Sequence, residues 1–186
     1  MDDKKIIDLY WSRDEQAIDE TKQSYGAYCF AIADNILGNS EDAEEYVNDA
    51  LLRVWESVPP RRPERLQSYI GAITRNLALN VYKRYRREKR GGGMADAVFG
   101  ELEGCIPDTQ SIERHSDSAH IAEVISAHLR RLPAEQRLVF VRRYWHFDSI
   151  ADIAQRYGMT ESKVTSMLYR VRKSLKSTLE KEGITI

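Results

Sequence analysis

The sequence lacks the features that mark a membrane or secreted protein. No apolar run is long enough to span a bilayer, and the acidic start MDDKK has no apolar signal core behind it. The two cysteines, Cys29 and Cys105, lie far apart and form no CxxC pair, so we expect free thiols in a reducing compartment. These absences favour a cytoplasmic protein with no membrane segment of its own.

Motifs of catalysis and metal binding are missing as well. The chain has no Walker loop, no GxSxG and no HExxH, and its four histidines have no metal-ligand spacing with the cysteines. We therefore expect no catalytic residue, no metal site and no cofactor. The function predicted from these absences is binding without bond-breaking chemistry, so the protein is not expected to be an enzyme.

Charge is abundant but segregated, although the net formal charge is only −1. Residues 1–60 hold 5 basic and 14 acidic side chains, a net of −9, whereas residues 61–90 hold 10 basic and 2 acidic ones, a net of +8. The positive block ends in KRYRREKR, residues 83–90, directly before three glycines. A basic block of this kind fits a nuclear signal, a loose arm or a helix lying on nucleic acid. The segregation suggests two partners of opposite charge.

Apolar residues recur at helical spacing through most of the first 90 residues. Stripes run over 17–36, 43–54 and 66–85, with Gly38 at a C-cap position and Asn39-Ser40 as an N-cap pair. Prolines 59, 60 and 63 end the second helix. The third stripe continues to Tyr85 within the basic block, which favours a helix docked on nucleic acid over a loose arm. No useful β-type alternation is present, so the expected fold class is all-α.

The middle of the chain has the composition of a linker. Residues 91–118 contain five of the ten glycines, one proline and a net charge of −5 from 1 basic and 6 acidic residues. Helical periodicity returns near Ala119, and Pro133 stands where a further helix begins. We expect two small helical domains, residues 1–90 and 119–186, joined by a flexible acidic linker over 91–118.

A helix-turn-helix pattern lies in the C-terminal domain. Ser149 and Asp152 fit a capping box, Gly158 suits a tight left-handed turn, and Thr160 is a good N-cap for a longer second helix. The second helix of such a motif enters the major groove by its N-terminal end. An ordinary helical hairpin with a solvated basic face is the alternative, but the short polar side chains at 161–166 favour DNA contact.

With these features assembled, the chain resembles the extracytoplasmic-function sigma factors of bacterial RNA polymerase. DAEEYV, residues 42–47, matches the D-A-E-[DE]-x-V core of the polymerase-binding helices, and ITRN, residues 73–76, matches the I-x-R-N of the promoter-reading helix. From LPAEQR at 132–137 to RVRKSL at 170–175, the chain is similar to the second domain of that family. The three pieces occur in order around the linker.

The resemblance implies roles for three groups of residues. A polymerase-binding set lies on the acidic helix and comprises Asp42, Glu45, Asn48, Asp49 and Leu52. A set for the −10 promoter element, including the loop VPPRRPERL that captures an unstacked base, comprises Arg61, Arg62, Arg75, Asn76, Asn80, Lys83, Arg84, Arg86 and Arg87. A set for the −35 element comprises Thr160, Glu161, Ser162, Lys163, Ser166, Arg170 and Lys173.

The expected function is therefore a dissociable sigma factor, monomeric when free, that directs promoter recognition, DNA melting and transcription initiation. Its expected partners are core RNA polymerase, promoter DNA and a restraining anti-sigma factor. A stand-alone helix-turn-helix regulator is one alternative, and a helical adaptor that binds only protein is another. The first leaves the acidic DAEEYV helix unexplained, and the second leaves two basic faces without a purpose.

Overall fold

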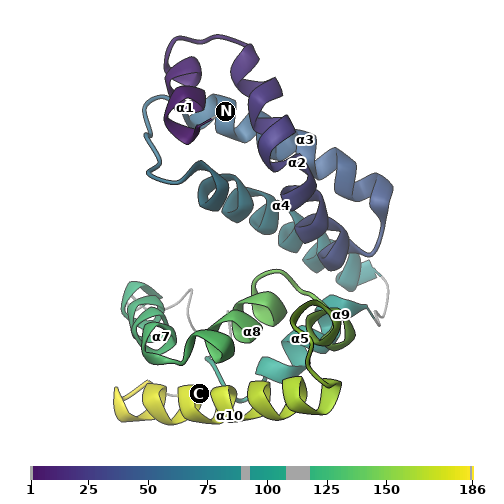
Figure 1. The fold of residues 1–186 in the computed structure, drawn as a ribbon, viewed down its shortest axis with the longest axis vertical. Helices are drawn as coiled ribbons and strands as arrows, with labels where there is room; N and C mark the ends of the chain where they lie inside the picture. The colour runs from purple at the N-terminus through teal and green to yellow at the C-terminus, as the bar shows by residue number, and fades with distance from the viewer. Residues whose placement is uncertain (1, 89–92, 108–117, 185) are drawn as a thin grey trace. The chain divides into compact units, whose positions relative to one another are not determined.

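The computed structural model describes residues 2–88, 93–107, 118–184 and 186, which form two compact units, Met1–Ala95 and Asp96–Ile186 (Figure 1). Every regular element in these described ranges is an α-helix. The all-α class with two small helical domains is confirmed.

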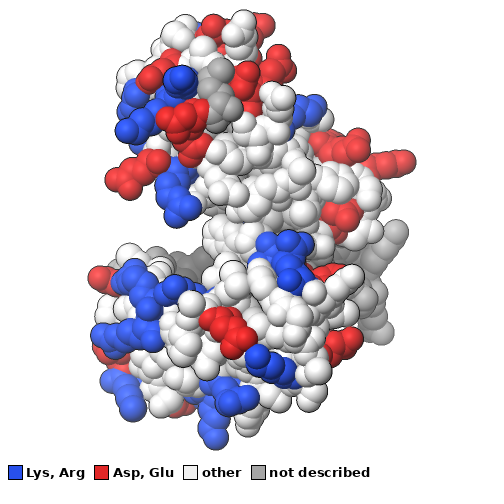
Figure 2. Space-filling view, viewed as in Figure 1, with Lys and Arg blue, Asp and Glu red and all other residues white. Residues whose placement is uncertain are grey.

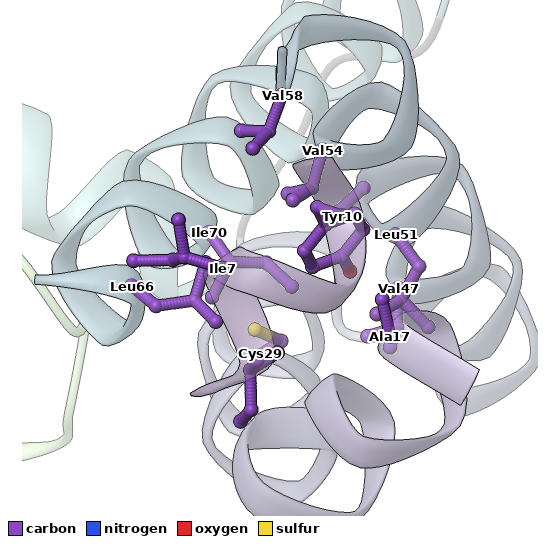
Figure 3. Close-up of a cluster of buried hydrophobic side chains, with 12 residues drawn as sticks. Ile7, Tyr10, Ala17, Cys29, Val47, Leu51, Val54, Val58, Leu66 and Ile70 are labelled. Atoms are coloured by element: carbon purple, nitrogen blue, oxygen red, sulfur yellow. The ribbon is translucent and has the colours of Figure 1, made fainter. Parts of the chain in front are cut away.

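The N-terminal unit is built from four helices, α1 (Asp3–Trp11), α2 (Gln16–Leu37), α3 (Ser40–Ser57) and α4 (Leu66–Glu88). Helices α2, α3 and α4 pack against one another, and α1 packs on α2. Figure 3 shows the resulting core, in which Ile7 of α1 lies beside Leu66 and Ile70 of α4. Tyr10 reaches the α3 side of the same cluster and is fully buried.

Local sequence signals set the helix ends in this unit. Gly38 adopts the left-handed conformation with φ of 66° and ends α2. The Asn39 side chain then accepts backbone N–H groups of Glu41 and Asp42, which caps α3. Helix α3 ends at Ser57, directly before the proline-rich segment. The apolar stripes predicted for α2 and α3 face the core.

The stripe predicted for α4 is buried or partly buried from Leu66 to Val81 but not at its last member. Tyr85 is exposed, and the Arg84 guanidinium lies over its ring at 5.6 Å from the centroid. Gly71 lets α2 approach α4, because a Cβ there would lie 2.6 Å from the Tyr28 hydroxyl oxygen. Helix α4 therefore has one face packed on α2 and α3 and leaves Asn76, Asn80 and Lys83 exposed to solvent.

The C-terminal unit contains α7 (Ser118–Arg131), α8 (Ala134–Tyr144), α9 (Ile150–Tyr157) and α10 (Glu161–Lys181), with α10 packed on the other three. Figure 1 shows α10 running along the base of this unit. The stripe predicted for its inner face is buried and comprises Val164, Met167, Leu168, Val171 and Leu175.

The expected linker is not without structure, because α5 (Met94–Leu102) occupies part of it. Phe99 packs edge-on against Phe147 with ring centroids 5.8 Å apart, and Glu101 binds side chains of α8 and α10. Most of α5 thus belongs to the C-terminal unit. Residues 108–117 lie outside the described residues, and the role of the linker as a tether remains a prediction.

Candidate functional site

An exposed acidic face runs along α3 and contains the residues predicted to bind polymerase. Glu45, Asn48, Asp49 and Leu52 are exposed and Asp42 is partly buried, at positions that recur every three or four residues. Leu52 is the apolar member, 52% exposed. We call these five residues the acidic face; Figure 2 shows acidic side chains gathered where α2 meets α3.

Among the described residues, no salt bridge involves the carboxylates of the acidic face. Asn48 accepts a hydrogen bond from the Lys22 ammonium at 3.3 Å. Of the other four residues, three are exposed to solvent and Asp42 is partly buried. Acidic residues in the first turn, Glu41 and Asp42, also complement the positive end of the helix dipole. Helix stability therefore explains the first-turn acids, whereas it does not require Glu45, Asp49 or the exposed Leu52.

The −10 set divides between a loop and one face of α4. Asn76, Asn80, Lys83 and Arg84 are exposed at helical spacing on α4, opposite the buried Thr74, Ala78 and Val81. Arg61 is exposed in the loop that precedes the helix. The side chains of Arg86 and Arg87 lie outside the described residues, although the backbone there is helical.

Two members of the −10 set are less available than the sequence suggested. Arg75 is partly buried, and burial lowers the pKa of its guanidinium. Arg62 forms an ion pair with Asp8 of α1 and lies 5.6 Å from the centroid of the Trp11 ring. Arg62 is therefore held by α1 in the free protein, while Arg75 lies at the edge of the core.

The helix-turn-helix forms from α9, a glycine turn and α10 as predicted. The Ser149 hydroxyl accepts the Asp152 backbone N–H at 3.0 Å and caps α9. Gly158 has φ of 62°, which an L side chain rarely adopts, so it permits the tight turn. The Thr160 hydroxyl then accepts the Lys163 N–H at 3.2 Å and caps α10.

Every residue predicted for the −35 element is exposed, on α10 or, for Thr160, at its N-cap, and we call this surface the recognition face. Two of its long side chains are held by contacts with other residues: the Lys163 ammonium binds the Glu135 carboxylate of α8 at 2.9 Å, and the Arg170 guanidinium donates to the Ser166 carbonyl at 3.2 Å. The face also includes Tyr169, 58% exposed, which the sequence analysis missed. Its spacing of three residues from Ser166 was the available signal.

A largely buried ionic cluster holds α5, α8 and α10 together. The Glu101 carboxylate accepts hydrogen bonds from Arg143, from the Tyr144 hydroxyl at 2.8 Å and from Arg172 at 3.3 Å. Arg143 is only 3% exposed and also donates to the Asp148 carbonyl at 2.9 Å. Burial alone would raise the pKa of Glu101, but the bonds from Arg143 and Tyr144 and the two positive charges lower it.

Within the described ranges, no group of three His, Cys, Asp or Glu side chains is arranged to hold a metal ion. Cys29 and Cys105 are both free thiols, and burial raises the pKa of Cys29 to about 11. Burial and then the nearby Arg142 lower the pKa of His146 to about 4, so this imidazole is neutral at neutral pH. In the same part of the chain, no helix has the length and apolarity needed to cross a bilayer.

A unit with an acidic and a basic helix, followed by a helix-turn-helix unit, defines a helical DNA-binding protein of two domains. Comparison with protein families matches residues 23–90 to sigma-70 region 2 and residues 122–175 to sigma-70 region 4. The chain belongs to the extracytoplasmic-function sigma factors. Helices α1 and α5 lie outside both matched ranges.

Curated relatives are similar along most of the chain. The ECF RNA polymerase sigma factor SigL of Mycobacterium tuberculosis is 27% identical over 165 residues, covering 87% of this chain and 88% of that protein. SigE of Mycolicibacterium smegmatis is 24% identical over 165 residues, covering 89% and 62% of the two chains. EcfG of Rhodopseudomonas palustris is 26% identical over 155 residues, covering 82% and 80%.

Proposed function

We propose that the chain binds core RNA polymerase as a monomer in the cytoplasm and directs it to promoters, where it assists melting and transcription initiation. The observation that carries this proposal is the order of parts: an exposed acidic face on α3, a basic α4 and a separate helix-turn-helix, in matched regions 2 and 4. We propose that the protein itself is not an enzyme and neither forms nor breaks covalent bonds. An anti-sigma factor is the partner that restrains it.

The acidic face is the proposed docking site for polymerase. Four of its members are exposed, and Leu52 offers an apolar contact among carboxylates. Such a surface suits a basic helical partner, because charge complementarity steers association while apolar contact contributes affinity. A stand-alone helix-turn-helix regulator has no need of this surface, and a protein-only adaptor has no need of the recognition face.

The proposed −10 interface combines α4 with the segment that precedes it, residues 58–65, which we call the capture loop. Exposed Lys83 and Arg84 are suited to phosphate contact, which supplies affinity without reading sequence. The capture loop, with Arg61 and Arg62, holds an unstacked base of the melted strand by stacking and electrostatic attraction.

The decisive experiment is reconstitution with core polymerase. The chain should co-elute with core enzyme and confer promoter-dependent run-off transcription that core enzyme alone does not give. DNA binding by the chain with no association with core polymerase would support the stand-alone regulator instead. Association with core polymerase but no DNA binding, either by the chain alone or by its complex with core polymerase, would support the protein-only adaptor.

The two proposed DNA surfaces should respond differently to substitution. Replacing Lys163 or Ser166 by alanine should relax selectivity at one −35 position by about 1–3 kcal/mol, because these side chains reach base edges. Arg84→Ala should weaken binding about equally across promoters and lower the salt dependence by roughly one unit of slope. The measurement is promoter binding by the holoenzyme over a salt series on −35 variants.

Because Lys163 is paired with Glu135, Glu135→Ala is the matched variant for that position. It removes the pairing partner and leaves the proposed base contact in place, so −35 selectivity should be retained. If Lys163→Ala leaves the −35 preference untouched while Arg84→Ala changes it, the assignment of the two surfaces is wrong.

A further inference from the structure

Helix α1 and the turn that follows it contact the capture loop and both of its flanks, although they lie outside the matched region 2. Before the start of the capture loop, near the end of α3, the Trp55 carbonyl accepts a hydrogen bond from the Arg13 guanidinium at 2.7 Å. Arg13 lies in the turn just beyond α1. In the middle, Asp8 forms an ion pair with Arg62. At the end, the Asp3 carboxylate accepts the Leu66 backbone N–H at 2.9 Å.

The contact at the end of the loop is also a helix cap. Leu66 is the first residue of α4, and its N–H is one of the donors that a helix cannot satisfy internally. Asp3 satisfies it from another helix and places a negative charge at the positive end of α4. The Tyr25 hydroxyl donates to the second Asp3 oxygen, and burial and Asp3 together raise the pKa of Tyr25 to about 12. Tyr25 therefore stays a donor at neutral pH and orients Asp3.

The contact in the middle of the loop fixes a side chain of the proposed DNA interface. Arg62 is held between the Asp8 carboxylate and the Trp11 ring, two groups one helical turn apart on α1. Trp11 is 44% exposed and is an aromatic surface next to the capture loop. The torsions of the arginine side chain are thereby restricted before any DNA arrives, which lowers the entropy cost of binding.

The α1 contacts are anchored in the core. Ile6, Ile7 and Tyr10 of the same helix are buried, and Tyr10 shares a 2.9 Å hydrogen bond with Thr21 of α2. Asp8 and Trp11 lie outside this buried stripe, are exposed, and contact Arg62 of the loop. Helix α1 is therefore a fixed support whose polar residues are free to hold the loop.

We propose that Asp3, Asp8 and Trp11 are positioning residues that hold the capture loop and Arg62 in the conformation that receives an unstacked base. This inference rests on the proposed function, because it assigns a role to α1 in the same interface. For the removal of the Asp8 charge, this inference predicts weaker recognition of the unstacked base, whereas simple electrostatics predicts stronger DNA binding. Asp8 is an acid beside a DNA surface, and removing its charge alone should strengthen DNA binding.

The test uses reconstituted holoenzyme and single-stranded oligonucleotides carrying the −10 element of the non-template strand. An abasic site is moved along the strand to find the position where the wild type loses most affinity, expected to be about tenfold for a stacked base. The measured quantity is the ratio of affinities for the intact and abasic strands. Absence of any such position, or of binding to core polymerase, would count against the proposed function itself.

Asp8→Asn, Trp11→Leu and Asp3→Ala should each lower this ratio to about threefold or less, with core binding unchanged. Asp19→Asn is the matched control, since it removes one exposed acidic charge from α2, outside these contacts. A purely structural defect would weaken both strands equally and leave the ratio unchanged. An unchanged ratio in both Asp8→Asn and Trp11→Leu, or a higher affinity for both strands in Asp8→Asn, would overturn the inference.

Discussion

Replacing Asp42 and Glu45 by arginine is expected to abolish binding to core polymerase while the protein stays folded. The two substitutions change the charge of the acidic face by four units, so a basic partner surface is repelled where it was attracted. Neither side chain lies in the core, since Glu45 is exposed and Asp42 partly buried. Size-exclusion co-elution with core enzyme gives the binding result, and circular dichroism gives the helical content.

The matched control is Glu41→Arg with Glu44→Arg on the same helix. It makes the same change in charge on a neighbouring face, and both of its residues are exposed. This control should retain most of the binding, because the proposed contact is a face and not the overall charge of α3. Equal loss of core binding in both double variants would point to long-range electrostatics alone. Undiminished co-elution of the variant with Asp42 and Glu45 replaced would contradict the proposed docking site.

Replacing Glu101 by alanine should destabilise the C-terminal unit by about 3–5 kcal/mol, the cost of leaving a buried charge without its partner. Arg143 would keep its bond to the Asp148 carbonyl but lose the carboxylate that neutralises it. Arg172 and Tyr144 would lose the same acceptor. Native-state hydrogen exchange of α8 and α10 amides in the full chain measures the effect.

The same cluster predicts a dependence on pH. The folded-state pKa of Glu101 lies below its ordinary value, because its bonds and neighbouring charges outweigh burial. Its contribution to stability is therefore fully present above the ordinary glutamate pKa and is lost as the pH falls through the folded-state value. The gap between wild type and Glu101→Gln should shrink on acidification. Glu103→Ala, at an exposed acid two residues further on, should have little effect at any pH.

Much of the fold could be predicted from the sequence where apolar spacing and capping residues agreed. Gly38, Asn39, Ser149, Gly158 and Thr160 all occupy the helix ends that their types suggested. Local rules suffice there because each cap satisfies donors within a few residues of itself. The exposed acidic face and recognition face followed from the same periodicity, since whatever leaves the apolar stripe reaches solvent.

Helices α1 and α5 were missed for different reasons. Helix α1 is short, and only Ile6, Ile7 and Tyr10 mark its buried side. Helix α5 has apolar residues at helical spacing at 94, 95, 98, 99 and 102. The glycines around it favoured the prediction of a linker over that of a helix. Both are held by contacts with residues far along the chain, such as Asp8 with Arg62 and Glu101 with Arg143. A local sequence pattern does not predict stabilising contacts with residues so distant in the sequence.

The docking of α5 sets how far the two halves of the chain can separate. With α5 bound to α8 and α10, the connection between Glu88 and Met94 spans at most about 20 Å when fully extended. If α5 were released, the chain from Glu88 to Ser118 could span about 100 Å. The difference of about 80 Å equals the length of roughly 24 base pairs of B-DNA. The Glu101 cluster thus limits the length of chain that is free to extend between α4 and the C-terminal unit.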